Sequence, residues 1–534
     1  MRLDILKVDG FKNLNNVSVD FDKEELSTVL VGLNGTGKSN VLEALVTIFR
    51  ALDLRETIPF RCFLRYECNK HAIEIDNRWT DEASPLRILV DGIPTTINRF
   101  IDQAAHLLPS HVFGYYSGGT RRFEVLFDKH QNRYYTNIIK PGSDRTVDPL
   151  DPSLRRLFYA RPFYGQLALL THFADLGESV PAFLARDMKI TGFHSALIVM
   201  KRPSWAKNKP NEIFREHGDP HFWYATGVVR HLLSALWEHA LAPLRITENV
   251  LEDYREKPHA EEHIYIFIKD ELTLREIARP FGSQQSFFAM LETLDISGLV
   301  REVKLWVKRD STNEELPFHE ISDGEKQLLT VLGLMKFTQQ KQSLFLLDEP
   351  DTHLNPAWKR DYLNLIQDVA GKSNDSYLVM TSHDPLTISG LEAKQIQILS
   401  QQKDGTIRAS RPMVDPKGLG VAGILTDVFG LDTALDLDTQ NKLDLRNELF
   451  AIPEKSRTPE QAKLLQKTTE ELAALGFRQA SRDPLYAKFL QRMEQRKLAT
   501  QRVFTPDEIS QLNDIADEII EELMREENDD LHKV

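Results

Sequence analysis

Near its start the chain carries the stretch T-V-L-V-G-L-N-G-T-G-K-S, which covers Thr28–Ser39. Its first four residues are β-branched or apolar and predict a strand, while the last eight match the pattern G-x-x-x-x-G-K-S. The next ten residues, Asn40–Phe49, have apolar side chains at helical spacing. A strand–loop–helix order is the context in which such a loop binds phosphate, because its glycines let backbone N–H groups converge on phosphate oxygens.

Side chains of this loop have distinct expected roles. Lys38 is expected to act catalytically, as a cation beside the β- and γ-phosphates of ATP, and the Ser39 hydroxyl can be a ligand of Mg²⁺. A glycine-rich turn that merely starts a helix is the alternative, which the complete motif disfavours. The residues expected to bind the nucleotide here are Asn34, Gly35, Gly37, Lys38, Ser39 and Asn40.

Two adjacent acids follow a second apolar strand. Ser343–Leu347 is followed directly by Asp348 and Glu349, at the end of a strand where α/β sheets bind ligands. Asp348 is expected to hold Mg²⁺, and Glu349 to orient and deprotonate the attacking water. Packing alone does not explain two neighbouring carboxylates at this position.

Three polar segments complete an ordered set. I-S-D-G-E-K-Q, at Ile321–Gln327, precedes a predicted helix, so that its first residues form either an anion-binding helix start or an ordinary N-cap. Asp351 lies in the loop after the acidic pair. The apolar strand Tyr377–Thr381 leads to His383, which can hydrogen-bond a γ-phosphate or the attacking water, although an isolated histidine is more often structural.

Elsewhere the patterns leave alternatives open. Val112–Tyr116 predicts a strand, and the glycine-rich loop after it is either a structural turn or the place of a γ-phosphate-sensing residue or a ligand of a metal-bound water. The basic, aromatic-containing stretches Arg155–Arg161 and Lys201–Lys209 are either solvated loops or nucleic-acid contacts. Strands are also predicted at Leu3–Val8 and Val17–Phe21, and in an accessory sheet at Ile73–Ile75 and Leu86–Val90, with buried strands at Ala196–Met200 and Ile264–Ile268 and helices at Phe163–Phe173 and Trp223–Leu241.

Length and composition set limits. The 534 residues predict two to four packing units. No run approaches the roughly 18 apolar residues of a membrane helix, and we expect a cytoplasmic protein without a membrane partner. Cys62 and Cys68 are expected to be buried free thiols. The net charge of −13 argues against a protein that coats nucleic acid, but 11 acidic and three basic residues from position 501 onward carry most of it.

Taken in order, the phosphate loop, the Ser-Asp-Gly segment, the acidic strand, the aspartate loop and the histidine resemble those of ATP-binding-cassette (ABC) ATPases of the RecF, SMC and OLD type. V-D-G-F-K-N-L at Val8–Leu14 is similar to the opening that this group shares. The resemblance covers residues 1–50 and about 317–400. It implies an α/β fold: an ABC-type ATPase head, with a mixed sheet flanked by helices, that is split by a helical insertion and followed by a mainly helical C-terminal region.

The corresponding domain boundaries are an N-terminal ATPase lobe at 1–130, a mostly helical insertion at 131–300, a C-terminal ATPase lobe at 301–410 and a helical partner-docking region at 411–534. Lys38 and Ser322 are 284 positions apart without sustained heptads, which excludes a long coiled coil between the lobes.

In such families two heads sandwich two ATP molecules. The resemblance therefore implies a homodimer in which Ser322 and Gly324 contact the γ-phosphate of the other protomer's ATP, while Asp351 couples the two sites. Asp323 and Glu325 depart from the glycine and glutamine usual in transporter signatures, and an acid beside a phosphate leaves the turnover rate open. The sequence does not identify a glutamine-loop residue.

A narrower resemblance, to the PtuA type of ATPase from Septu antiphage systems, lies in Tyr115–Gly118, Thr381–Leu386 and Gly420–Leu431. It implies a separate HNH nuclease as effector, and in some systems a retron, so that DNA or retron RNA/DNA is an open partner. The chain itself shows no nuclease motif; the D-x-D pair Asp436 and Asp438 follows no strand. A RecF- or SMC-like repair ATPase and a nucleotide-gated scaffold with negligible turnover remain alternatives.

The C-terminal region predicts helices. Glu460–Leu475 is amphipathic, with Thr458 as its N-cap and a proline at the first helical position. A further helix begins after the capping box at Thr505–Glu508, and its stripe packs either on the chain itself or on a partner. The stripe consists of Ile509, Leu512, Ile515, Ile519 and Leu523.

Overall fold

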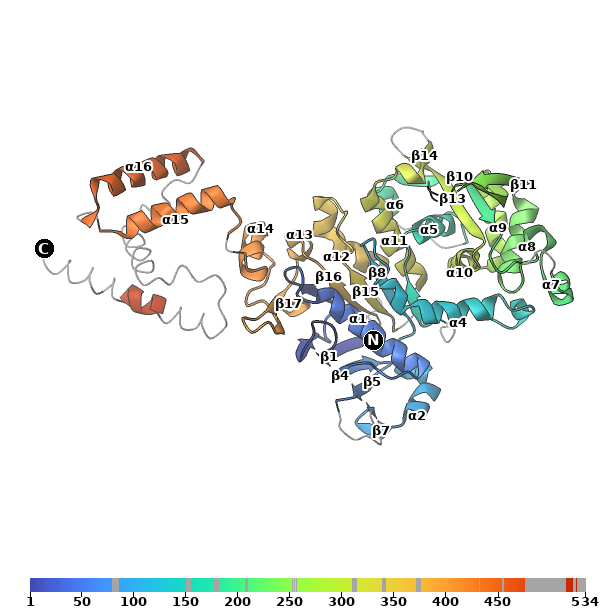
Figure 1. Cartoon of the computed structure of the whole chain (residues 1–534), viewed down its shortest axis with the longest axis horizontal. Helices are drawn as coiled ribbons and strands as arrows, with labels where there is room; N and C mark the ends of the chain where they lie inside the picture. Colours follow the sequence, from blue (N-terminus) through green and yellow to red (C-terminus); the bar gives the residue numbers. More distant parts are fainter. Residues whose placement is uncertain are drawn as a thin grey trace. The chain divides into compact units, whose positions relative to one another are not determined.

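The protein is described here by a computed structural model. It forms two compact units, Met1–Gly418 and Leu419–Val534, both drawn in Figure 1. The residues that the structure describes are 1–78, 86–149, 155–176, 182–206, 210–251, 253, 255, 257–309, 315–338, 342–370, 376–431, 433–453, 456–475, 515–521 and 525.

A seven-stranded sheet forms the centre of the first unit, with the strand order β18-β17-β3-β16-β15-β8-β9. Neighbouring strands are parallel, except that the edge strand β18 is antiparallel to β17. Because β3, β16, β15 and β8 are parallel, their carboxyl ends meet at one edge of the sheet. The strands are β3 (Ser27–Val31), β8 (Val112–Tyr116), β9 (Leu157–Tyr159), β15 (Leu344–Asp348), β16 (Tyr377–Thr381), β17 (Ile396–Gln401) and β18 (Ile407–Ser410).

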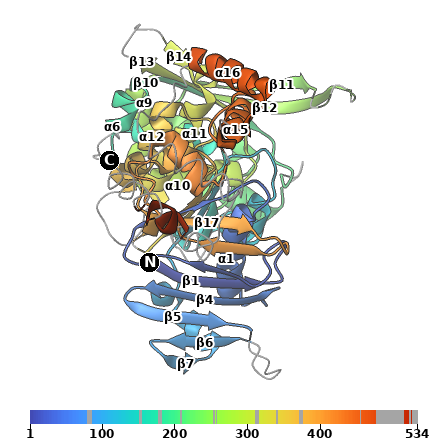
Figure 2. The same cartoon turned by 90° about the vertical axis from the view of Figure 1, so that its left-hand side faces the viewer.

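Helix α1 (Lys38–Leu54) lies between this sheet and a second, six-stranded antiparallel sheet, as Figure 1 shows. The helix buries twelve residues, and its apolar side chains belong to one core cluster with residues of both sheets. The second sheet has the order β2-β1-β4-β5-β6-β7 and is seen as a ladder in Figure 2. Its strands are β1 (Arg2–Asp9), β2 (Val17–Asp20), β4 (Arg61–Cys68), β5 (His71–Asp76), β6 (Arg87–Val90) and β7 (Ile93–Thr95), followed by α2 (Ile97–Asp102) and α3 (Ala104–Leu107).

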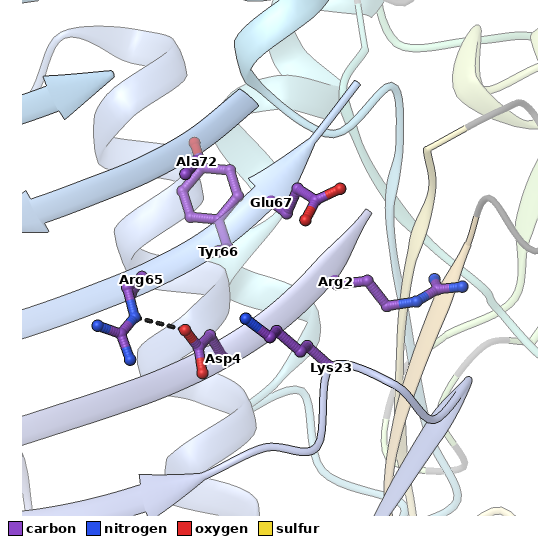
Figure 3. A pocket seen from close by; sticks show the side chains of 7 residues that line it. All are labelled: Arg2, Asp4, Lys23, Arg65, Tyr66, Glu67 and Ala72. Atoms are coloured by element: carbon purple, nitrogen blue, oxygen red, sulfur yellow. Dashed lines mark hydrogen bonds and ion pairs between the residues drawn. The ribbon is translucent and has the colours of Figure 1, made fainter. Parts of the chain in front are cut away.

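A surface pocket of about 290 Å³ lies on the six-stranded sheet, over β1 and β4 (Figure 3). Arg2, Lys23, Arg65, Asp4 and Glu67 contribute charges of both signs to its lining. Arg65 pairs with Asp4, and Arg2 donates a hydrogen bond of 2.8 Å to a backbone carbonyl. The pocket therefore offers no concentrated charge of one sign to a ligand.

The insertion between the two ATPase lobes contains helices and, in addition, a substantial sheet. The predicted helix Phe163–Phe173 is confirmed, whereas Trp223–Leu241 is helical only over Val229–His239. Five antiparallel strands have the order β11-β12-β10-β13-β14. Ala196–Met200 and Ile264–Ile268 were predicted as strands and lie within β10 and β12, but the description as a mostly helical domain is incomplete. The elements are α4 (Asp128–Ile138), α5 (Tyr164–His172), α6 (Ala182–Arg186), β10 (Ile190–Lys201), α7 (Glu212–His217), α8 (Val229–His239), β11 (Leu241–Val250), β12 (His259–Ile268), α9 (Glu271–Ala278), α10 (Gln284–Ile296), β13 (Val300–Arg309) and β14 (Glu315–Pro317).

Close helix packing joins the insertion to the C-terminal lobe, whose helices are α11 (Asp323–Thr338), α12 (Pro356–Ala370) and α13 (Pro385–Ile388). A Cβ atom on Gly165 of α5 would lie 2.8 Å from the hydroxyl of Thr330 on α11. A Cβ atom on Gly333 would lie 2.9 Å from that of Ala168. Since α5 and α11 approach this closely only through glycine, the insertion is part of the same compact unit as the ATPase lobes.

A buried ion cluster ties the far end of α1 to the insertion. Asp53 accepts hydrogen bonds from His130 at 2.9 Å, from Arg133 at 2.8 Å and from Arg156 at 2.8 Å. Burial alone would raise the pKa of Asp53, but the hydrogen bond from His130 and the guanidinium groups of Arg156 and Arg133 lower it overall. The helix that begins at the phosphate loop is therefore anchored at both ends.

The second unit is helical in the part that the structure describes. It contains α14 (Gly420–Gly423), a π-helical turn at Ile424–Val428, and the packed helices α15 (Leu437–Ala451) and α16 (Pro459–Ala474). Thr458 and Gln461 form a capping box at the start of α16, which confirms the predicted N-cap. Of the predicted terminal stripe, Ile515 and Ile519 lie in a described helical segment, and Ile509, Leu512 and Leu523 lie outside the described residues.

The observed architecture confirms the predicted fold class. It is α/β, with a mixed sheet flanked by helices, an insertion that splits the two lobes, and a helical region at the end. Cys62 and Cys68 are buried free thiols, as predicted. Among the described helices, none combines the length and the apolar character needed to cross a membrane.

Candidate nucleotide-binding and hydrolysis site

The glycine-rich loop lies between β3 and α1 and has the conformation that its sequence demands. Gly32, Gly35 and Gly37 have φ values of 144°, 84° and 89°, in the region that disfavours other residues. A Cβ atom on Gly32 would lie 2.3 Å from the carbonyl oxygen of Leu399. Asn34 is exposed on the loop. The three glycines thus let the loop backbone curl directly before α1, which is the arrangement in which backbone N–H groups bind a phosphate.

The N-terminal V-D-G-F-K-N-L segment braces this loop. Asn13 donates a hydrogen bond of 2.8 Å to the carbonyl of Gly35 and accepts one of 2.6 Å from Asn40. A Cβ atom on Gly37 would lie 2.8 Å from the Asn13 side chain. Lys12 pairs with the buried Glu43 of α1. Sequence inspection identified the segment but not this contact, which explains why an asparagine follows the basic residue.

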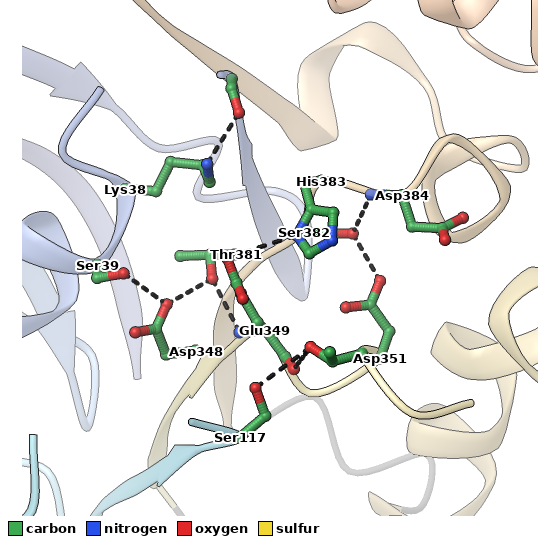
Figure 4. Close-up of polar contacts among 12 residues, drawn as sticks. Lys38, Ser39, Ser117, Asp348, Glu349, Asp351, Thr381, Ser382, His383 and Asp384 are labelled. Carbon is green, nitrogen blue, oxygen red and sulfur yellow. Dashed lines mark hydrogen bonds and ion pairs between the residues drawn. The ribbon is translucent and has the colours of Figure 1, made fainter. Parts of the chain in front are cut away.

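Ser39 and Asp348 meet although 309 positions separate them (Figure 4). The Ser39 hydroxyl donates a hydrogen bond of 2.9 Å to Asp348 Oδ1, and the Thr381 hydroxyl donates one of 2.7 Å to the same oxygen. Asp348 is 1% exposed. A hydroxyl and a carboxylate at one point fit Mg²⁺, which proteins commonly hold through one or two side chains plus substrate phosphates and water.

Arg122 is a residue of this site that the sequence did not reveal. Its guanidinium donates a hydrogen bond of 3.0 Å to Asp348 Oδ2, lies 4.0 Å from Glu43 and stacks 4.8 Å from the ring centre of Tyr116. Both carboxylate oxygens of Asp348 are therefore engaged by donors of the chain itself. The loop after β8 therefore reaches the acidic pair.

The same loop ends with a second contact. Ser117 donates its backbone N–H to the carbonyl of Asp348 at 3.2 Å, and its hydroxyl lies 3.2 Å from that of Thr352. The strand β8 is the neighbour of β15, so Ser117 stands at the strand end where a glutamine-loop residue was sought.

Glu349 and His383 lie next to each other at the ends of β15 and β16. His383 Nδ1 is 3.4 Å from Glu349 Oε1, and both side chains are partly exposed. Glu349 has a φ of 51°, an uncommon value outside glycine that is typical of functional sites. Thr381 fixes this geometry, because its hydroxyl accepts a hydrogen bond of 2.9 Å from the Glu349 backbone N–H while donating to Asp348.

Lys38 is buried beside these acids. Its Nζ donates hydrogen bonds to the carbonyls of Gly32 at 2.8 Å and Leu33 at 3.3 Å. Burial lowers the pKa of Lys38, and the carboxylates of Glu349 and Asp348 partly oppose that change. Burial raises the pKa of Asp348, opposed by the hydrogen bonds from Thr381 and Ser39 and by the charge of Arg122. The site thus concentrates ionisable groups in a water-poor place.

Asp351 is placed differently from the other predicted residues. It is 1% exposed and accepts hydrogen bonds of 2.6 Å from Ser382 and 2.5 Å from Thr387. Burial raises the pKa of Asp351, although both hydroxyl donors lower it. Ser382 also accepts a hydrogen bond of 3.0 Å from the N–H of Asp384. Asp351 therefore holds the loop that carries His383 in its own chain, rather than projecting outward (Figure 4).

The Ser-Asp-Gly segment begins α11 and makes its contacts locally. Ser322 and Glu325 form reciprocal capping hydrogen bonds. A Cβ atom on Gly324 would lie 2.5 Å from the carbonyl oxygen of His353, so glycine is required there. No hydrogen bond joins Ser322 to the phosphate loop within the described part of the chain.

Gln327 connects this segment to the catalytic loop of the same chain. Its amide group lies 3.5 Å from the carbonyl of Glu349 and accepts a hydrogen bond of 3.1 Å from the N–H of His353. A glutamine one turn into a helix gave no signal in the sequence. It becomes visible only when α11 and the loop after β15 are brought together.

The two basic stretches do not form a nucleic-acid surface as far as they are described. Arg155 pairs with the buried Glu292, Arg156 with Asp53 and Arg161 with Asp295. Both the solvated loop and the nucleic-acid contact are wrong for this stretch, because it enters the buried edge strand β9. In the second stretch, Trp205 donates a hydrogen bond of 2.7 Å to the carbonyl of Ser297, and positions 207–209 lie outside the described residues.

The acidic pair in the C-terminal unit has a structural role. Asp436 caps α15 by accepting a hydrogen bond of 3.0 Å from the N–H of Thr439, and Asp438 pairs with Lys442 at 2.9 Å. Among the described residues there is no group of three or more His, Cys, Asp or Glu side chains that could hold a metal ion.

Two protein families match the chain. The family described as "AAA ATPase domain" matches residues 1–90, and that described as "AAA domain, putative AbiEii toxin, Type IV TA system" matches residues 221–389. The first match contains the phosphate loop. The second contains the signature segment, the acidic pair and His383.

Curated relatives are the Septu protein PtuA of Bacillus mycoides (strain KBAB4), 26% identical over 149 residues, and that of Bacillus thuringiensis, 28% identical over 138 residues. The alignments cover 24% and 23% of this chain. They span about a fifth (21%) and a third (34%) of the length of these relatives.

Solved structures with a similar fold include the SMC head domain from Thermotoga maritima, at 12% identity and a TM-score of 0.32, covering 78% of this chain and 100% of that one. Another is the recombination mediator protein RecF with ATP, at 16% identity and a TM-score of 0.29, covering 77% of this chain and 97% of that one.

Proposed function

We propose that this chain, which is an ABC-type AAA ATPase similar to the Septu PtuA proteins, hydrolyses Mg-ATP between two copies of itself and thereby controls a separate effector, an HNH nuclease, in bacterial antiphage defence. The family matches and the ordered set of motifs support the ATPase part. The similarity to the PtuA proteins supports the defence role.

One observation carries the hydrolytic part of the proposal. Lys38 and Ser39 at the start of α1, Asp348 and Glu349 at the end of β15, and His383 after β16 converge at one edge of one sheet. These groups come from three segments that are far apart in the sequence. Packing requirements do not explain a lysine, two acids and a histidine collected at one point.

The chemistry follows from the positions of the side chains. Lys38, released from the carbonyls of Gly32 and Leu33, supplies a cation to the β- and γ-phosphates. Mg²⁺, when held by Ser39 and Asp348, neutralises phosphate charge. Glu349 orients the attacking water and accepts its proton.

His383 stands beside that base. It lies close enough to hydrogen-bond the water or the γ-phosphate once nucleotide is bound. The Thr381 hydroxyl fixes the positions of Asp348 and the Glu349 backbone relative to each other. The metal ligand and the base are thereby directed at the same phosphate.

A site shared between two copies is supported by the exposed start of α11. The Ser322 segment is accessible and makes its hydrogen bonds with Glu325, not with the phosphate loop of its own chain. We propose that it meets the ATP bound by the other copy. His353 and Gln327 then link each signature to the catalytic loop of its own chain.

The test of hydrolysis compares the wild type with Glu349→Gln in steady-state phosphate release and in ATP binding. We expect release to fall by roughly 10² to 10⁴, the usual contribution of a general base, with binding retained. Asp361→Asn, on the exposed face of α12, is the control for loss of one acid. If wild-type release is already at background while ATP binds, the scaffold alternative replaces the enzyme.

An effector role is proposed for the C-terminal unit. Leu435, Leu437, Phe450, Leu464 and Leu475 are large apolar residues that are exposed in this unit, with Leu437 at 76%. We propose that the effector covers part of this apolar surface when it is bound. Mass identification of proteins co-purified with the full chain from its native host tests the proposal: a small nuclease is expected, and its loss on truncation after Gly418 locates the docking surface. Recovery of no nuclease under conditions that preserve complexes contradicts the effector role.

A further inference from the structure

The start of α11 holds an acid where the proposed function requires a phosphate. Glu325 Oε2 accepts a hydrogen bond of 2.7 Å from the Ser322 hydroxyl and one of 2.9 Å from the Ser322 backbone N–H. Of these two donors, the Ser322 hydroxyl is the one that a γ-phosphate from the other copy would use at this helix start. A carboxylate presents its two oxygens at nearly the spacing of two phosphate oxygens, so Glu325 occupies this position as an internal anion.

The second oxygen of the same carboxylate has its own cation. Arg309, the last residue of β13, pairs with Glu325 Oε1. The side chains of Arg309 and Glu325 are 29% and 14% exposed, so this pair is partly shielded from water. A guanidinium carries five N–H donors, so that its pairing with Glu325 leaves Arg309 with further donors for a second anion.

A phosphate and the Glu325 carboxylate cannot share these donors. Two anions at hydrogen-bond distance repel each other strongly in a partly buried place. The other nearby acid differs: Asp323 is 80% exposed and faces Lys326 at 3.6 Å. Of the two acids that depart from the usual signature, Glu325 is therefore the one that competes with phosphate.

We propose that Ser322 and Arg309 together form the phosphate-binding site of the signature, and that Glu325 occupies this site until the γ-phosphate of the other copy's ATP displaces it. Arg309 then turns from Glu325 to the phosphate and becomes its second ligand. The inference rests on the proposed two-copy ATP site and adds Arg309 and Glu325 to its residues.

This arrangement gives the site a link to the insertion. Arg309 ends β13, which pairs with β10 and β14 in the insertion sheet. Arrival of a phosphate thus changes a contact at the end of that sheet, and not only at α11. Binding of nucleotide by the other copy is thereby coupled to the insertion sheet through Arg309.

The experiment measures ATP-dependent association by sedimentation velocity with ATP and Mg²⁺, in a Glu349→Gln background that prevents turnover. Glu325→Gln keeps a side chain that can cap the helix but removes the competing charge. We expect the ATP concentration for half-maximal association to fall about tenfold, which corresponds to about 1.4 kcal/mol. Asp323→Asn removes one charge from the same helix start and should shift it by less than twofold.

Arg309→Ala separates the two roles of the arginine. If Arg309 binds phosphate, adding Arg309→Ala to Glu325→Gln weakens association about tenfold relative to Glu325→Gln alone. If Arg309 only neutralises Glu325, the two proteins associate equally, and the assignment of Arg309 as a phosphate ligand is overturned.

The other outcomes are equally distinct. An unchanged half-maximal concentration in Glu325→Gln, with ATP-dependent association intact, overturns this inference but leaves the proposed function standing. Equal shifts in Glu325→Gln and Asp323→Asn reduce the effect to net charge and overturn it as well. Absence of ATP-dependent association in the Glu349→Gln background contradicts the two-copy site itself, and the inference falls with it.

Discussion

The phosphate-loop side and the signature side of the proposed site are built in opposite ways. On the first side, Ser39, Asp348 and Thr381 are joined by hydrogen bonds between three segments, and Asp348 and Thr381 are almost fully buried. On the second side, Ser322 is exposed and bound by Glu325 from its own helix. The phosphate-loop half is already assembled in the single chain, whereas in the signature half the Glu325 carboxylate of the same chain occupies the Ser322 hydroxyl.

This difference teaches where control can act. A preassembled half has little to gain from a partner, because its groups are already held within hydrogen-bond distance. A half that is capped by its own carboxylate becomes available only when a stronger anion arrives. If the proposed shared site operates, hydrolysis depends on the first half for chemistry and on the second half for the moment at which the site forms.

The largest effect on turnover is expected from a substitution in the preassembled half of the site. Thr381→Val removes the hydroxyl that holds both Asp348 and the Glu349 backbone, and we expect phosphate release to fall about 10²-fold because metal ligand and base lose their register. Thr28→Val is the matched control: Thr28 is also buried, in the neighbouring strand β3, and its hydroxyl bonds Tyr377 at 2.7 Å. It should lower stability without a comparable loss of turnover. Equal turnover in both variants contradicts a positioning role for Thr381.

The second prediction concerns the anchor of α1. Asp53→Asn removes the acid shared by His130, Arg133 and Arg156, and we expect the free energy of unfolding of the first unit to fall by about 3 kcal/mol at pH 7. Because the folded pKa of Asp53 is lowered, its contribution is complete above the unfolded value of about 3.9 and is lost as the pH falls through the folded value.

Urea unfolding at pH 7, 5 and 3 checks both parts. The gap between wild type and Asp53→Asn should be smaller at pH 3 than at pH 5. A gap that widens toward pH 3 contradicts the lowered pKa, and the absence of a gap at pH 7 shows that the anchor does not stabilise the unit.

The third prediction tests whether Arg122 competes with the metal. Arg122→Ala frees Asp348 Oδ2 from the guanidinium, so we expect the Mg²⁺ concentration for half-maximal binding of a fluorescent ATP analogue to fall several-fold. Arg121→Ala is the neighbouring control, because Arg121 is 65% exposed and pairs with Glu124 and Asp128 instead. An unchanged or higher Mg²⁺ requirement in Arg122→Ala would show that the arginine supports the metal site.

The smallest effect is expected at the link between the halves. Gln327→Ala removes the amide that contacts the Glu349 carbonyl and the His353 N–H. We expect kcat to fall by about three- to fivefold with little change in ATP affinity, since only the contact between α11 and the loop that carries Glu349 is weakened. Lys326→Ala, one position earlier and paired with Asp323, controls for a change at this helix. A change in affinity without a change in kcat would place Gln327 in nucleotide binding instead.

The sequence predicted the parts of the site that local pattern encodes. The loop Gly32–Ser39 and the pair Asp348 and Glu349 each follow an apolar strand, so their position at the sheet edge could be inferred from a few residues on either side. The N-cap Thr458 was predicted in the same way and confirmed. In each case, neighbouring residues contain the full signal.

What escaped prediction depends on partners distant in the sequence. Arg122 meets Asp348 from 226 positions away, and Arg155 meets Glu292 from 137 positions away. Neither pair can be recognised from neighbouring residues, so the sequence alone indicates only that these arginines lie in loops or at the surface. The insertion sheet was predicted only at its buried strands β10 and β12. The edge strand β11 was missed, since it is largely exposed and has no clear alternation of apolar residues.

The central claim is that a working site needs the phosphate loop of one copy and the signature of another. Its most direct test mixes two inactive variants, Lys38→Ala, with a defective phosphate loop, and Ser322→Arg, with a blocked signature. In a mixed pair, one site combines the intact loop of the Ser322→Arg chain with the intact signature of the Lys38→Ala chain. We predict that phosphate release by the equimolar mixture exceeds the sum of the separate variants and reaches about a quarter of wild type, from half the pairs each with one intact site. If both variants are folded and phosphate release by the mixture equals the sum of their separate rates, the shared site is contradicted.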